Sequence, residues 1–178
     1  RNRRQRQMCI RDRVEIDTYG DQPNINLDNI STNEVTSVSS ALAIGGTRDV
    51  SAEILPPFEV ISELELAPTI IGGLGMHAGF ETTWRARFTY DGDSDPFVVD
   101  TAGLGGIDFQ VGAGDRFQLR LFSDLPSAIF ITVYDASDPN KVSSYTLVNS
   151  LVNPTTTFDI FYADFTAIGA NGGADSVS

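Results

Sequence analysis

The stretch WRARFTY, residues 84–90, decides the fold class of this chain. Every second residue from Trp84 to Tyr90 is apolar, and the residues between them are polar. Successive side chains of a β-strand point to opposite faces, so this alternation gives one apolar face and one polar face. A strand of this kind buries its apolar face against a second layer of structure. The stretch therefore predicts an antiparallel sheet with one face in solvent.

The same period of two recurs at residues 50–54, 58–60 and 116–121. No apolar stripe with the 3.6-residue helical period runs for ten residues or more, and Gly, Asp, Asn and Pro interrupt the chain at short intervals. Many short strands joined by turns are typical of sandwiches. We therefore expect an all-β fold, an antiparallel β-sandwich of jelly-roll or Greek-key type.

The remaining segments divide into strands and loops. Residues 128–134 are more continuously apolar, which predicts a strand at the centre of a sheet. Turn-forming residues 135–140 follow, and residues 142–148 return the chain, so we expect a hairpin. Residues 158–165 predict another strand, whereas the Asp, Asn, Pro and Ser of residues 20–33 predict an irregular loop.

Residues 3–13 differ from everything that follows, because they are basic and contain Cys9, the single cysteine. When one permitted codon is chosen for each of these residues, the resulting nucleotide sequence resembles the transposase adapter of sequencing libraries. A basic arm for nucleic acid and the charged start of a signal peptide are the alternatives, but no apolar run follows. We interpret residues 1–13 as a non-native, disordered segment. We interpret residues 14–178 as a single β-sandwich domain that lacks its final strand or strands.

Setting the segment aside changes the charge of the chain. The whole sequence has 12 basic and 24 acidic residues and a net charge of −12. Residues 14–178 have 6 basic and 23 acidic residues, a net charge of −17, and no cysteine. This charge argues against nucleic acid and anionic lipid as partners, and no apolar run is long enough for a transmembrane segment. The strong negative charge suits an exported protein in a salty or calcium-containing medium.

The order of strands and turns resembles a jelly-roll domain of exported bacterial proteins, many of which carry a C-terminal anchor of the PEP-CTERM type. The stretches that carry the likeness are GGTRD (45–49), GIDF (106–109), DRFQL (115–119), residues 129–134, SSYTL (143–147) and TFDI (157–160). The resemblance implies a fold similar to galactose-binding-like domains and carbohydrate-binding modules. It also implies a secreted or cell-surface location in bacteria, although a fold alone does not define a function.

A candidate metal site lies in the turn that follows residue 90. Asp91, Asp93 and Asp95 occupy alternate positions, and oxygen ligands with this spacing suit Ca²⁺. The pattern resembles the start of an EF-hand loop, but no Glu stands at the twelfth position. A solvated acidic turn is the favoured alternative. If calcium binds, Asp17, Asp21 or Asp28 from the N-terminal loop are candidates for further ligands.

Four of the six basic residues after residue 13 occupy outward positions of two predicted strands: Arg85, Arg87, Arg116 and Arg120. One hypothesis is a ligand face for an acidic glycan, with Trp84 or Tyr90 stacking on sugar rings. The alternative is ion pairing with glutamates of neighbouring strands, of which the candidates are Glu53, Glu59, Glu63 and Glu65. Ion pairing is favoured, because Trp84 alternates onto the core face.

Signals for catalysis are weak. The stretch GLGMHA, residues 73–78, matches a dinucleotide-binding pattern, but a strand follows where a helix is required, so we expect a flexible loop. His77 is the single histidine, which leaves too few His and Cys for zinc, and no Gly-x-Ser-x-Gly elbow is present. We therefore expect no enzyme activity and no certain cofactor, with calcium as the candidate.

The resulting expectation is a non-catalytic extracellular or cell-surface module that binds carbohydrate, with a glycan or cell-surface polymer as its partner. One alternative is an accessory domain of a glycoside hydrolase, or a weak glycoside hydrolase itself. Another is a structural surface-layer module.

Overall fold

The computed structural model describes residues 24–28, 30–41, 43–57, 63–68, 74–79, 82–107, 109, 115–123, 126–149 and 152–168. Within these residues strands dominate, every strand pairing is antiparallel, and the helical segments are two short 3-10 turns. The predicted all-β class is confirmed, while the jelly-roll or Greek-key arrangement stays a prediction. In this part of the chain no helix is long and apolar enough to cross a bilayer.

The described residues fall into two compact units, residues 24–106 and residues 107–168. Whether residues 14–178 form a single domain stays a prediction. The adapter-like residues 1–13 and the expected missing strand beyond residue 178 lie outside the described residues. The predicted strand at residues 58–60 also lies outside them.

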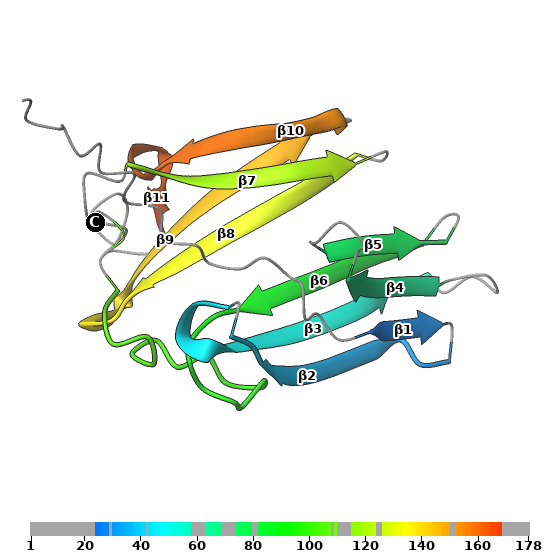
Figure 1. The fold of residues 1–178 in the computed structure, drawn as a ribbon, viewed down its shortest axis with the longest axis horizontal. Coiled ribbons are helices and arrows are strands. Elements are labelled where there is room, and N and C mark those ends of the chain that lie inside the picture. The colour runs from blue at the N-terminus through cyan, green and yellow to red at the C-terminus, as the bar shows by residue number, and fades with distance from the viewer. Residues whose placement is uncertain are drawn as a thin grey trace, which may run out of the picture. The chain divides into compact units, whose positions relative to one another are not determined.

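The first unit contains two three-stranded sheets with the strand orders β1-β4-β5 and β2-β3-β6 (Figure 1). The strands of the first sheet are β1 (Ile25–Asp28), β4 (Glu63–Pro68) and β5 (Leu74–Ala78). Those of the second sheet are β2 (Asn33–Ser39), β3 (Thr47–Leu55) and β6 (Thr83–Thr89), and the 3-10 turn η1 (Ile44–Gly46) leads into β3.

The apolar faces of these sheets contribute to one hydrophobic core. Its buried members are Ile25, Leu27, Val50, Ala52, Ile54, Leu64 and Leu66. The partly buried Trp84, Ala86 and Phe88 of β6 pack against them, while the residues between them are exposed. The alternation of residues 84–90 and 50–54 therefore marks the core face, as predicted. Burial of these side chains is the main stabilising contribution to the unit.

Two predicted loops in this unit are strands. Residues 25–28 form β1 rather than part of an irregular loop, and residues 74–78 form β5 rather than a flexible loop. Both pair with β4, and Ile25 and Leu27 are 0% and 3% exposed. Both segments are strands because they pair with a strand that is distant in the sequence. β-propensity depends on packing against such neighbours more than on local composition.

The second unit contains a two-stranded sheet, β10-β7, and a three-stranded sheet, β11-β9-β8 (Figure 1). The bounds are β7 (Arg116–Ser123), β8 (Ser127–Asp135), β9 (Asp138–Asn149), β10 (Val152–Phe161), η2 (Tyr162–Asp164) and β11 (Thr166–Ala167). The hairpin of β8 and β9 is confirmed by their antiparallel register. The expectation that residues 128–134 lie at a sheet centre is wrong. Among the described strands β9 is central, and Phe130 of β8 is 74% exposed.

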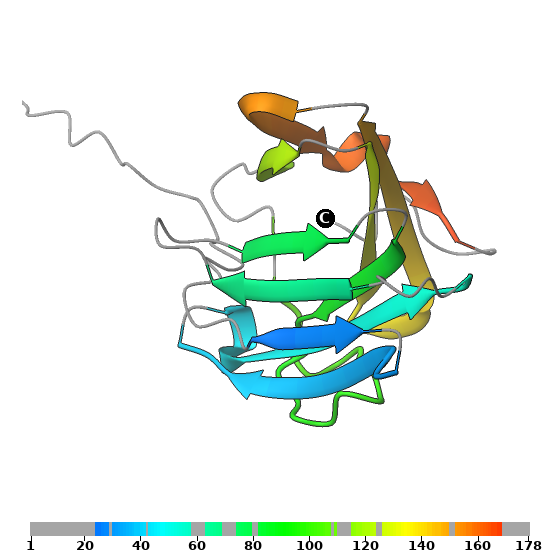
Figure 2. The ribbon, with the colours of Figure 1, turned by 90° about the vertical axis from the view of Figure 1, so that its right-hand side faces the viewer.

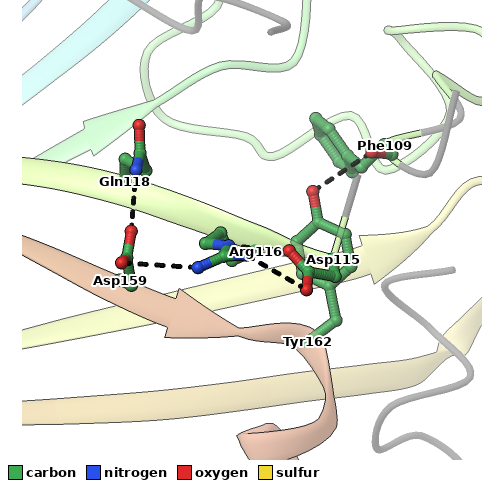
Figure 3. Close-up of polar contacts among 6 residues, drawn as sticks. All are labelled: Phe109, Asp115, Arg116, Gln118, Asp159 and Tyr162. Carbon is green, nitrogen blue, oxygen red and sulfur yellow. Dashed lines mark hydrogen bonds and ion pairs between the residues drawn. The ribbon is translucent and has the colours of Figure 1, made fainter. Parts of the chain in front are cut away.

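Aromatic rings form the core of the second unit. The ring of Phe117 lies edge-on to Phe109 at 5.3 Å, to Tyr162 at 5.0 Å and to Phe165 at 5.8 Å between centroids. The Tyr162 hydroxyl donates a hydrogen bond of 3.1 Å to the carbonyl oxygen of Phe109 (Figure 3). This bond satisfies the polar end of a side chain that is 7% exposed, as a buried tyrosine requires.

Candidate functional site

A polar hollow of about 290 Å³ lies on the outer face of the sheet β1-β4-β5. Figure 2 shows these three strands side by side. The residues that line the hollow are Asn26, Leu27, Asp28, Glu63, Leu64, Glu65 and His77. Leu27 and Leu64 belong to the core, so the alternation along β1 and β4 turns their polar neighbours outward into the hollow.

The strand register sets these polar side chains in two rows. Asn26 is opposite Glu65, and Glu65 is opposite His77, so one row crosses all three strands. Asp28 and Glu63 form the second row. Directly opposed residues in an antiparallel pair have Cβ atoms about 5 Å apart, within reach of one small ligand. The hollow therefore presents an amide, an imidazole and carboxylates on one face of a three-stranded sheet.

The carboxylate of Asp28 is already engaged by the turn that leaves β1. Its Oδ1 atom accepts hydrogen bonds from the main-chain N–H groups of Ser31 at 2.7 Å and Ile30 at 2.8 Å. These bonds lower the pKa of Asp28 and hold it ionised. Asp28 thus shapes the rim of the hollow, and Glu63 and Glu65 supply the acidic groups inside it.

The chemistry of the lining limits the ligands that fit. No Lys or Arg stands among the described residues that line the hollow. Carboxylates accept hydrogen bonds from hydroxyl groups, and an amide both donates and accepts them. An anionic ligand would be repelled by the carboxylates, which carry the same charge. The hollow therefore favours a neutral, hydroxyl-rich ligand.

Sequence reasoning missed this site, although a signal was present. The stretch ELEL, residues 63–66, alternates charged and apolar residues, so Glu63 and Glu65 share one face. The strand character of β1 and β5 was not visible in the sequence, and without those strands the glutamates have no partners. His77, predicted to be a loop residue without a role, is exposed on β5 beside Glu65.

Of the predicted arginines, Arg85 and Arg87 are exposed on β6 in the first unit. Arg85 is opposite Glu53 of β3, and its Nη2 atom lies 2.6 Å from Glu53 Oε2. The ion-pairing alternative is confirmed for this arginine. Trp84 packs against the core, so its ring does not form a sugar-stacking surface beside them.

The other two arginines, Arg116 and Arg120, are exposed on β7 in the second unit. Arg116 pairs with Asp115 at 2.7 Å and with Asp159 at 3.4 Å (Figure 3). Hydrogen bonding to Asp115 raises the pKa of Arg116, and its guanidinium lies 4.6 Å from the ring centroid of Phe161. Arg116 therefore joins β7 to β10, and a glycan-binding role for the four arginines stays a prediction.

The acidic turn uses its carboxylates to hold its own backbone. Asp91 is 4% exposed, and its two oxygens accept the N–H groups of Asp93 at 3.2 Å and Asp100 at 2.9 Å. Asp95 accepts the N–H of Phe97 at 3.0 Å. In the part of the chain that the structure describes, no three His, Cys, Asp or Glu side chains converge as metal ligands. Calcium at this turn stays a prediction.

Comparison with known proteins gives one partial match. No protein family matches the chain, and no solved structure matches it. A protein of Acidothermus cellulolyticus named imidazoleglycerol-phosphate dehydratase is 36% identical over 89 residues. Those residues are 50% of this chain and 39% of that protein, so the chain spans less than half the length of this relative.

This match overturns one expectation from the sequence. We expected the chain not to be an enzyme, but the similar protein is named for an enzymatic reaction. The expectation rested on the absence of a nucleophile elbow, a set of zinc ligands and a nucleotide-binding loop from the sequence. Acid–base chemistry needs only a carboxylate or imidazole in the right place, and that placement is set by tertiary pairing.

Proposed function

We propose that this chain is an extracellular or cell-surface β-module that binds carbohydrate in the hollow of β1-β4-β5. The row Asn26, Glu65 and His77 carries the proposal, because it places hydrogen-bonding groups across three paired strands. The resemblance to exported jelly-roll domains and the net charge of −17 over residues 14–178 support an extracellular location. With Trp84 in the core, recognition rests on hydrogen bonds rather than on ring stacking.

A glycan array with the full chain tests the proposal, followed by titration of the best glycan. Glu65→Gln keeps the shape of the side chain and removes its charge. A hydrogen bond to a charged group contributes about 1.5–3 kcal/mol, so we expect binding to weaken at least about tenfold. Glu53→Gln is the matched control, because Glu53 is on the outward face of the other sheet in this unit. Failure of any glycan to bind, or equal loss in both variants, would contradict the proposal.

A second candidate function is acid–base catalysis in the same hollow. Glu65 and His77 are opposed on neighbouring strands, and a carboxylate beside an imidazole can move a proton on a bound hydroxyl compound. The match to a protein named as a dehydratase favours this candidate. The name of that protein includes a phosphate compound. The described residues that line the hollow include no Lys or Arg to bind a phosphate group, so we do not assign that compound to this chain as a substrate.

Incubation of the chain with each bound glycan, and separately with imidazoleglycerol phosphate, distinguishes binding from catalysis. Turnover that Glu65→Gln or His77→Ala abolishes would place the reaction in the hollow. Binding without turnover would support the carbohydrate-binding proposal instead.

A further inference from the structure

The outer face of the β8–β9 hairpin, in the second unit, holds large apolar side chains in solvent. Ile131 and Val133 pack against the aromatic core, so the residues that alternate with them along β8 are on the opposite face. On that face Phe130 is 74% exposed and Tyr134 is 40% exposed. Val148 of β9, which the register places on the same face, is 74% exposed. Apolar side chains that gather in solvent, unlike scattered ones, mark an interaction surface.

Hydroxyl groups cross the middle of this outer face. Thr132 of β8 is opposite Ser144 of β9, and Ser144 is opposite Thr166 of β11, so one row of three hydroxyl side chains spans the sheet. Phe130 lies one outward position before this row on β8, and Tyr134 lies one outward position after it. An aromatic ring therefore lies on each side of the hydroxyl row.

Each aromatic side chain has apolar neighbours on the adjoining strand. Val148 lies diagonally across from Phe130, and Val142 is directly opposite Tyr134. Ile168, which follows β11, donates its main-chain N–H to the carbonyl oxygen of Val142 at 2.9 Å and is 47% exposed. The outer face thus has an apolar band, a hydroxyl band and a second apolar band.

The segments that build this face carry no charge. Residues 127–134, 142–148 and 166–168 contain no Asp, Glu, Lys or Arg, although residues 14–178 have a net charge of −17. Long-range repulsion opposes the approach of anionic lipid, of nucleic acid or of a second copy of the chain, since each is negatively charged. A neutral partner meets no such repulsion and leaves no charge on this face without a counterion.

We propose that this face binds an unbranched, uncharged polysaccharide. A sugar ring has C–H groups on its faces and hydroxyl groups at its edge, so it can stack on Phe130 and Tyr134 and exchange hydrogen bonds with the hydroxyl row between them. The two aromatic residues are four positions apart, which is about 13 Å along a strand. This distance is longer than one sugar ring, so the ligand is a chain of several sugars. The face belongs to a different unit from the hollow, and the proposal does not rest on binding in the hollow.

Depletion of the full chain from solution by insoluble cellulose or chitin tests the proposal, because both polymers are unbranched and uncharged. We expect adsorption that persists in 1 M NaCl, since no ion pair takes part. Phe130→Ala should weaken adsorption about fivefold, and the double variant with Tyr134→Ala at least about tenfold, through the loss of one and two ring contacts. Phe122→Ala is the matched control and should adsorb like the wild type, because Phe122 is 56% exposed on β7 of the other sheet in this unit.

Circular dichroism checks that each variant folds, and Tyr134→Ala alone replaces Phe130→Ala if the latter does not. Absence of adsorption to both polymers, or equal adsorption by wild type and folded variants, would overturn the proposal. Adsorption that Glu65→Gln abolishes and Phe130→Ala leaves unchanged would assign it to the hollow instead. Sedimentation supplies a further test, since a dimer that Phe130→Ala dissociates, without adsorption to either polymer, would assign the face to a second copy of the chain.

Discussion

Replacing Leu66 by alanine tests the register of β4, on which both the core and the hollow depend. Leu66 is 0% exposed and belongs to the core, whereas its neighbour Glu65 is exposed in the hollow. Leu66→Ala removes three buried carbons, which at about 0.8 kcal/mol each amounts to roughly 2.4 kcal/mol of transfer free energy. The cavity left behind adds to this, so we expect a loss of about 3–4 kcal/mol in the free energy of unfolding.

Urea unfolding followed by tryptophan fluorescence measures this loss. Trp84 is the single tryptophan and packs against the same core, so its emission reports the unit of residues 24–106. Glu65→Ala is the neighbouring control and should change the free energy of unfolding by no more than about 0.5 kcal/mol. A cost below about 1 kcal/mol for Leu66→Ala would refute the register. So would a large cost for Glu65→Ala, because a shift by one residue exchanges the two faces of the strand.

Three further predictions concern single contacts. A double-mutant cycle on Arg85 and Glu53, whose side chains are 69% and 38% exposed, should give a coupling of at most about 1 kcal/mol. The coupling should vanish in 1 M NaCl; persistence there would contradict an exposed ion pair. The lowered pKa of Asp28 stabilises the fold at neutral pH, and this stability is lost as pH falls below about 4. Asp28→Asn should therefore lower the melting temperature at pH 7 and flatten its acid dependence; parallel curves for both proteins would refute this. Gly103→Ala would place a Cβ atom against the carbonyl oxygen of Asp91, so it should cost about 1–3 kcal/mol in urea unfolding, and a neutral result would show that the loop packs differently.

Local alternation in the sequence was enough to predict much of the fold. Val50, Ala52 and Ile54 lie in the core as their spacing predicts. The hairpin of β8 and β9 follows from the turn residues at 135–140. These predictions succeeded because the two faces of a strand are set by covalent geometry, which is the same wherever the strand lies.

Outward positions were predictable only in part. The alternation placed Arg85 on an exposed face and Glu53 was among its candidate partners, and the structure confirms the pair. The continuously apolar run of residues 128–134 predicted a strand at a sheet centre, but Phe130 in this run is 74% exposed. An apolar residue in a strand does not reveal whether a second layer covers it.

Tertiary structure alone decided the candidate site in the hollow and the burial of Asp49. The sequence supplied Glu65 and His77, but only the pairing of β1 and β5 with β4 set them in one row. Asp49 is one of many acidic residues in the sequence, and its burial to 4% exposure on β3 is set by the folded chain. The physical reason is the same in both cases. A strand's own faces follow from its local geometry, whereas neighbours and burial depend on pairings between segments far apart in the chain.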